Sequence, residues 1–91
     1  MSTIHITANH TLGLASAKEQ AEKLASELQD RFAVEYQWSG DTIEFARPGA
    51  SGKIVAEESM VTVDVELGLM LAGFKGEVEK QLKSFLDQNL R

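Results

Sequence analysis

The chain contains no cysteine, a single proline and no long apolar run in its 91 residues. The lack of cysteine excludes disulfide bonds and thiolate metal sites. Cysteine usage therefore does not indicate whether the protein resides in an oxidising or a reducing compartment. No stretch reaches the roughly 18 apolar residues that a membrane-spanning helix requires. Basic residues are also few: 9 Lys and Arg stand against 14 Asp and Glu, giving a formal net charge of −5. Because an acidic chain repels phosphate backbones, we expect no nucleic-acid partner.

The composition is otherwise that of a folded domain, with 43% hydrophobic and 25% charged residues. A chain of this length accommodates one modest core, so we expect residues 1–91 to form a single domain. The amino-terminal stretch MSTIHITANH has neither the basic nor the apolar region of a signal peptide. We therefore expect a cytoplasmic protein without a membrane span.

Two kinds of apolar periodicity alternate along the chain. Apolar residues at steps of three and four predict one helix that starts at Leu14 and another that starts at Phe74. Alternation at every second residue predicts strands, which cover 3–8, 34–38, 42–46, 53–57 and 61–67.

Each predicted strand has one apolar and one polar face, which is typical of an antiparallel sheet covered on one side. Pro48-Gly49 followed by Ser51-Gly52 predicts a turn between two of the strands, because proline fixes φ and glycine accepts positive φ. The order β-α-β-β-β-β-α predicts an α+β two-layer sandwich, with both helices packed on one face of the antiparallel sheet.

The segment LGLMLAGFKG, residues 67–76, breaks the alternation. The favoured interpretation is a buried joint between the last strand and the last helix, since short continuous apolar runs often mark fully buried segments. The alternative is partial exposure, because three large apolar residues in succession cannot all point the same way. An exposed patch would mark a contact with a partner or ligand. The candidate contact residues of this segment are Leu69, Met70, Leu71 and Phe74.

The two histidines are the first candidates for chemistry. Their spacing matches no usual zinc pair, so we expect no metal. His5 falls on the polar face of the first strand, where pairing with the last strand would bring it close to Asp64 as a surface contact. His10 precedes the first helix. Hydrogen bonding to the local backbone is its favoured role, and a functional role is the alternative.

Trp38 is the chain's only tryptophan and is expected on the inner face of the sheet with Tyr36 and Phe45. The favoured interpretation is a core residue near the sheet edge, where the indole N–H can find a partner. The alternative is a ligand pocket lined by these rings together with Phe74 and Phe85. No Ser-His-Asp arrangement, phosphate-binding loop, GxGxxG or HExxH pattern occurs, and we expect no cofactor.

Several stretches taken together resemble a known family: IHI, HTLGLASAKEQAEKLA, YQWSGDTIEF, RPGASGKI and VDVELGLMLAGFKGEVE. They span essentially the whole chain and are similar to the polyhydroxyalkanoic acid system proteins, short bacterial proteins encoded beside polyhydroxyalkanoate synthesis and granule genes. The most specific elements are H-x-L-G, W-x-G-D, and L-G-x-x-L before F-K-G. None of them is a catalytic signature, so the resemblance implies a pathway and not a reaction.

The resemblance implies an accessory role in the metabolism of polyester storage granules. The first hypothesis is a non-enzymatic protein, cytoplasmic and granule-associated, that also forms a homodimer. It contacts a granule protein or the polyester surface through Leu69, Met70, Leu71 and Phe74. The second is a small helix-grip-like domain that binds a hydroxyacyl or fatty acyl group between sheet and helices. An enzyme that uses His10 or Asp41 ranks last.

Overall fold

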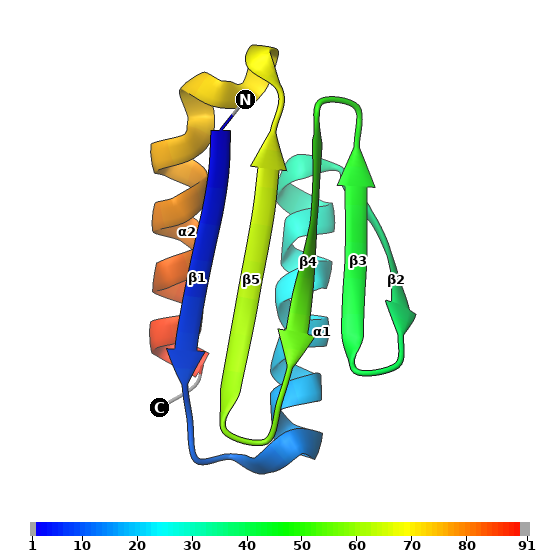
Figure 1. Cartoon of the computed structure of the whole chain (residues 1–91), viewed down its shortest axis with the longest axis vertical. Helices are drawn as coiled ribbons and strands as arrows, with labels where there is room; N and C mark the ends of the chain where they lie inside the picture. Colours follow the sequence, from blue (N-terminus) through cyan, green and yellow to red (C-terminus); the bar gives the residue numbers. More distant parts are fainter. Residues whose placement is uncertain (1, 90–91) are drawn as a thin grey trace.

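The alternating segments form a five-stranded antiparallel sheet in the computed structural model, which describes residues 2–89 (Figure 1). The strands β2 to β5 follow one another as a meander, and β1 pairs with β5, so the sheet order is β1-β5-β4-β3-β2. The α+β class and the order β-α-β-β-β-β-α are confirmed. The strands are β1 Ser2–Asn9, β2 Glu35–Ser39, β3 Thr42–Arg47, β4 Ala50–Ala56 and β5 Met60–Leu67.

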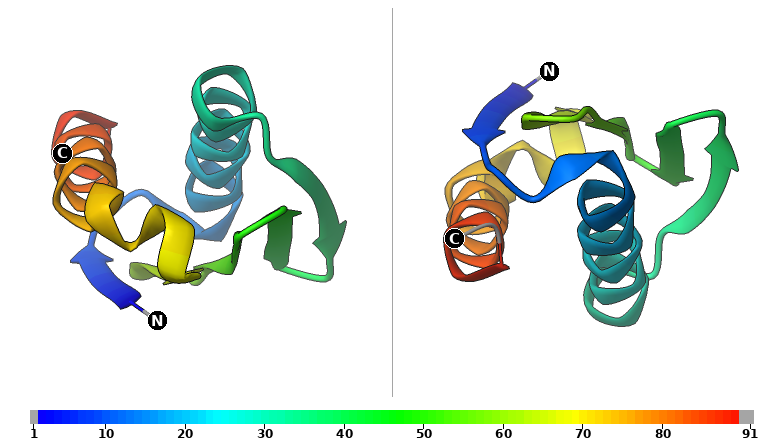
Figure 2. Two further views of the ribbon diagram at one scale, coloured as in Figure 1. Left: turned by 90° about the horizontal axis from the view of Figure 1, so that it is seen from above. Right: turned by 90° about the horizontal axis from the view of Figure 1, so that it is seen from below.

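Both α-helices pack on the same face of the sheet, as Figure 2 shows. The helix α1, Gly13–Phe32, lies over β3 and β4, and α2, Lys75–Asn89, lies over β1. Small side chains allow α1 to approach the sheet closely, because three of its five buried residues are alanine. No helix within residues 2–89 has the length and apolarity needed to cross a membrane. The buried helix residues are Ala17, Ala21, Leu24, Ala25 and Leu28 in α1, and Val78, Leu82 and Leu86 in α2.

The turn around Pro48 is shorter than the sequence predicts, and Gly52 lies outside it. Only Pro48 and Gly49 form the turn, because Arg47 pairs with Ala50 and β4 already begins at that residue. Gly52 lies inside β4 opposite Phe45, and a Cβ there would come within 2.6 Å of the Phe45 ring and 2.2 Å of the Asp64 carbonyl oxygen. Close packing of the ring on the backbone therefore explains this glycine.

The buried-joint interpretation of the segment after β5 is wrong, because part of this segment is exposed. Leu69–Phe74 forms a short 3₁₀ helix, η1, and α2 begins at Lys75. Leu67 is buried as expected, but 84% of Leu69 and 93% of Met70 are exposed. The reason is that η1 turns at the very end of the sheet, where neither strands nor helices extend far enough to cover its outer side (Figure 1).

Candidate functional site

The exposed apolar side chains of η1 form one surface at the end of the molecule. We define the η1 surface as Leu69, Met70 and Phe74, whose exposed fractions are 84%, 93% and 52%. A 3₁₀ helix has three residues per turn, so residues i and i+3 lie on the same side. Leu71 and Phe74 accordingly share one side of η1, where Leu71 packs against the core and Phe74 is half exposed, and Leu69 and Met70 are the most exposed of the four.

The segment η1 is attached to the turn between β3 and β4. The amide of Gly68 donates a hydrogen bond of 2.7 Å to the carbonyl oxygen of Gly49. The side chain of Leu71 packs on the same glycine, since a Cβ at Gly49 would lie 3.2 Å from its Cδ1. Gly49 has φ of +88°, a conformation that glycine adopts without strain. These contacts fix η1, so the exposure of Leu69 and Met70 is built into the fold.

An apolar cleft of about 250 Å³ opens beside η1, between the two helices and the sheet. In the view from above in Figure 2, the start of α2 and the last turns of α1 lie on the same face of the sheet, apart from each other. Ten of the twelve residues that line the cleft are apolar. They are Leu28, Phe32, Val34, Phe45, Ala50, Val65, Leu67, Leu71, Phe74 and Val78; Arg47 and Glu77 complete the lining.

Arg47 is the cation of the cleft and is held by backbone carbonyl groups. Its Nη1 donates to the carbonyl oxygen of Phe32 at 2.8 Å, and its Nε donates to that of Pro48 at 3.3 Å. The first bond satisfies a carbonyl group at the carboxyl end of α1. Within the described part of the chain no carboxylate forms an ion pair with Arg47. The guanidinium group therefore has N–H donors left for another partner.

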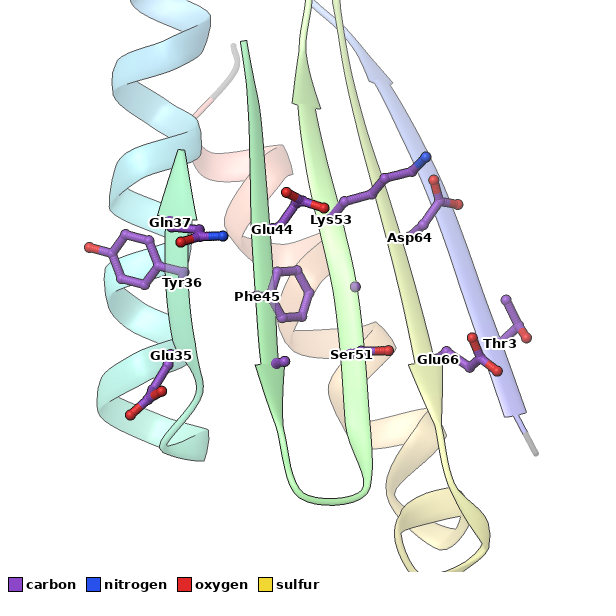
Figure 3. Close-up of a pocket in the computed structure, with 12 residues that line it drawn as sticks. Thr3, Glu35, Tyr36, Gln37, Glu44, Phe45, Ser51, Lys53, Asp64 and Glu66 are labelled. Atoms are coloured by element: carbon purple, nitrogen blue, oxygen red, sulfur yellow. The ribbon is translucent and has the colours of Figure 1, made fainter. Parts of the chain in front are cut away.

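A larger hollow, of about 710 Å³, lies on the opposite, uncovered face of the sheet (Figure 3). It is a shallow polar trough, in which Glu44, Lys53 and Asp64 stand side by side on adjacent strands. Asp64 also pairs with His5, which confirms the expected surface contact. Lys53 lies between the two carboxylates of this row, and among residues 2–89 no three His, Asp or Glu side chains are placed to hold a metal ion. We interpret the trough as a solvated sheet face.

His10 lies far from the η1 surface, and its two ring nitrogens both bond to the backbone. Nδ1 accepts a hydrogen bond from the amide of Leu12, and Nε2 donates to the carbonyl oxygen of Glu57, each at 3.1 Å. Only 6% of the residue is exposed. This arrangement supports the structural role over the functional one.

Trp38 lies at the β2 edge and lines neither hollow. Its Nε1 donates to Oε2 of Glu22 at 2.7 Å, which confirms that the indole N–H finds a partner at the sheet edge. The ring is 37% exposed, so Trp38 is less buried than a core residue. Lys18 covers it, with Nζ 5.5 Å from the ring centroid. The ring therefore joins β2 to α1. Of the five rings expected to line a ligand pocket, Phe45 and Phe74 line the apolar cleft, whereas Tyr36, Trp38 and Phe85 do not.

The structure brings Leu71 and Phe74 into the cleft and adds two residues that sequence reasoning missed, Arg47 and Glu77. Arg47 precedes a turn and Glu77 follows the start of a helix, positions at which charged residues are usually solvated. Their shared location depends on which strand and helix ends meet, and no local sequence pattern reports that. One sequence feature could have drawn attention to Arg47. It directly precedes Pro48-Gly49 and continues the series of apolar residues on the inner face of its strand.

The comparisons with known proteins identify a family. A family model described as "Putative polyhydroxyalkanoic acid system protein" matches residues 4–90. No curated protein and no solved structure matches the chain. The family match extends from β1 to the end of α2 and includes η1 and the cleft. The chain therefore belongs to this family of the polyhydroxyalkanoic acid system.

Proposed function

We propose that the protein is a non-enzymatic accessory protein of polyhydroxyalkanoate metabolism, which acts in the cytoplasm by contacting the surface of polyester granules through η1. The observation that carries the proposal is the exposure of Leu69 and Met70, at 84% and 93%, on a segment that backbone contacts hold in place. Exposed apolar side chains of this kind usually mark an interaction site. A hydrophobic polyester is a partner whose chemistry matches them.

The size of the η1 surface indicates a reversible contact. Full burial of Leu69 and Met70 contributes about 1.5–3 kcal/mol each, and Phe74, half covered already, contributes less. Association costs at least about 4 kcal/mol in lost translational and rotational freedom. One surface therefore binds weakly, and a homodimer that presents two of them would bind much more strongly through its higher effective concentration. This favours an exchanging accessory protein over a permanent granule coat.

A pelleting experiment with isolated granules tests the proposal. Leu69→Glu and Met70→Glu place a charge on the η1 surface without disturbing the core, because both side chains are solvent-exposed. We expect the unmodified protein to sediment with granules and both variants to remain in the supernatant. Ser84→Glu is the matched control, since it adds the same charge at an exposed position of α2 away from η1.

Two further arms make the outcome specific. Protein-free polyester particles separate polymer contact from contact with a granule protein, and light scattering across a concentration series reports the homodimer. Retention of granule binding by the folded Met70→Glu variant would refute the role of the η1 surface. If Leu69→Glu unfolds the protein, the exposure on which the proposal depends is wrong.

A second candidate function is favoured by the cleft: the chain would bind a hydroxyacyl or fatty acyl group between sheet and helices. The specific observation is the apolar lining of ten residues beside a volume of about 250 Å³. Ligand sites in proteins are typically concave and mostly apolar, with a few placed polar groups.

A further inference from the structure

We propose that the cleft holds the tail of one carboxylate-bearing acyl chain and that Arg47 binds its carboxylate. This inference rests on the second candidate function, acyl binding, and is independent of granule contact by the η1 surface. It assigns a ligand class and a binding residue to a site that the family assignment leaves open.

The volume of the cleft selects the size of the tail. A dry cavity of about 150 Å³ accommodates benzene, and ordinary ligand pockets measure about 300–1,000 Å³. The cleft, at about 250 Å³, lies between these limits. A water molecule takes about 30 Å³ in the liquid, and a methylene group is similar in size, so the cleft holds about eight such groups. A medium-length acyl chain fits this space, and a nucleotide cofactor does not.

Arg47 supplies charge complementarity at one side of this apolar space. A guanidinium group has five N–H donors, and the two backbone carbonyl groups of Phe32 and Pro48 occupy two of them. The remaining three are on Nη1 and Nη2. Since backbone carbonyl groups already hold the side chain, little side-chain entropy is lost when a carboxylate binds. Among residues 2–89 no carboxylate forms an ion pair with this charge.

Glu77 sets the orientation of the bound acyl chain. Its exposed side chain also lines the cleft, from the first turn of α2, and carries a negative charge. Like charges repel, so the carboxylate of a bound acyl chain is placed toward Arg47 and away from α2. Replacing Glu77 by glutamine should therefore strengthen binding of an anionic chain and leave binding of a neutral chain unchanged.

Octanoate and 1-octanol are the probes that separate headgroup recognition from apolar binding. They have tails of equal length, and only octanoate carries a charge. We expect octanoate to bind about tenfold or more tightly than octanol, since hydrogen bonds to ionised groups are the strong ones. Amide chemical shifts in nuclear magnetic resonance titrations locate the binding, and should change for residues around Val65, Leu71 and Val78. Adding 3-hydroxyoctanoate and butyrate tests the hydroxyacyl form and the tail length.

Arg47→Gln tests the assigned residue. The preference for octanoate over octanol should fall to about onefold in this variant, with octanol binding retained. Arg31→Gln is the matched control, because Arg31 is exposed in α1 and pairs with Glu27 outside the cleft. Since Arg47 also bonds to the end of α1, a denaturation curve accompanies each variant. The comparison of octanoate with octanol on the unmodified protein needs no variant.

Equal binding of octanoate and octanol by the unmodified protein would overturn the role of Arg47. Absence of shifts around the cleft with every probe would overturn the site itself. Amide chemical shifts of the cleft residues could instead change with protein concentration in the absence of any probe. That result would mean that a second copy inserts its η1 side chains into the cleft, and it would also overturn the proposal. Granule pelleting of the Met70→Glu variant is unaffected by these results, so failure of this inference and failure of granule contact can be told apart.

Discussion

The imidazole ring of His10 joins segments that are far apart in the sequence. Its hydrogen bonds reach Leu12 before α1 and Glu57 after β4, and its own backbone amide donates to the carbonyl oxygen of Ser59 at 2.9 Å. The ring therefore fastens the end of β1 to the turn between β4 and β5. Because the ring is buried, its removal leaves backbone groups unsatisfied that water does not easily reach.

We expect His10→Ala to lower the free energy of unfolding by about 1–3 kcal/mol, the cost of unsatisfied buried polar groups. The matched control is His5→Ala on the open sheet face, where loss of the exposed pair with Asp64 should cost about 0–1 kcal/mol. Urea denaturation of both variants measures the difference. Equal destabilisation by the two variants would contradict the assigned role of His10.

Single residues were predictable from sequence where the partner follows from strand register. His5 and Asp64 face each other because β1 and β5 pair in register, and alternation in both strands indicates that. Arg47 and Glu77 were not predictable as neighbours of one cleft, since their proximity depends on how α2 leaves β5 through η1. Long-range geometry, and not residue chemistry, was the missing information.

At the scale of elements, one carboxylate fastens the edge strand β2 to α1. Oε1 of Glu22 accepts from the Tyr36 hydroxyl at 3.1 Å, and Oε2 accepts from the Trp38 indole. Partial burial of the tyrosine, its hydrogen bond to Glu22, and the negative charges of Glu22 and Asp30 raise the pKa of the Tyr36 hydroxyl above its ordinary value of 10.0. The neutral hydroxyl is therefore the form that the folded state favours.

A pH dependence follows from this raised pKa. Above pH 10.0 the unfolded chain loses the tyrosine proton before the folded chain does, so the folded state binds more protons and stability falls as the pH rises. We expect Tyr36→Phe to be less stable than the unmodified protein at neutral pH, and this difference to shrink as the pH rises above 10.0. Urea midpoints at several pH values measure it.

Any other effect of alkaline pH acts on both proteins alike, so the comparison of the two proteins cancels it. The chain has one tyrosine, so the absorbance of tyrosinate reports the pKa of Tyr36 directly. A stability difference that stays constant or widens with pH would contradict the assigned contact with Glu22.

Most elements were predictable because their apolar residues follow one clear period. The exceptions are the start of β4 and the segment η1. Glycine and serine at 51 and 52 suggested a turn, but the packing of Phe45 on Gly52 explains the glycine. In η1 the apolar run suggested burial, but a run of this kind reports only low polarity. Whether Leu69 and Met70 are covered depends on the length of the neighbouring elements.

At the scale of the whole molecule, charge and apolar surface are separated. The open sheet face carries acidic residues with few cations, and the chain as a whole has a net charge of −5. The η1 surface contains no charged residue and projects from one end of the long axis (Figure 1). The proposed attachment to granules therefore has two alternative physical origins. One is apolar contact through the η1 surface, and the other is electrostatic attraction through charged residues.

Salt distinguishes these modes. Between about 0.1 and 1 M salt the Debye length falls from about 10 to about 3 Å, so attractions between exposed charges are largely removed. Apolar burial persists, and sulfate strengthens it because the ion is excluded from protein surfaces. We expect the granule-bound fraction to stay constant or to rise with sodium chloride, and to rise with sodium sulfate. Pelleting across a salt series measures both.

The Met70→Glu variant provides the control for this series, and it should remain unbound at every salt concentration if Met70 makes the contact. A steep fall in binding with sodium chloride would contradict apolar attachment. The attraction would then come from cations near the same end, among which Lys75 directly follows η1. Lys75→Gln would identify that case, since it removes the positive charge that directly follows η1 in the sequence and leaves Leu69 and Met70 in place.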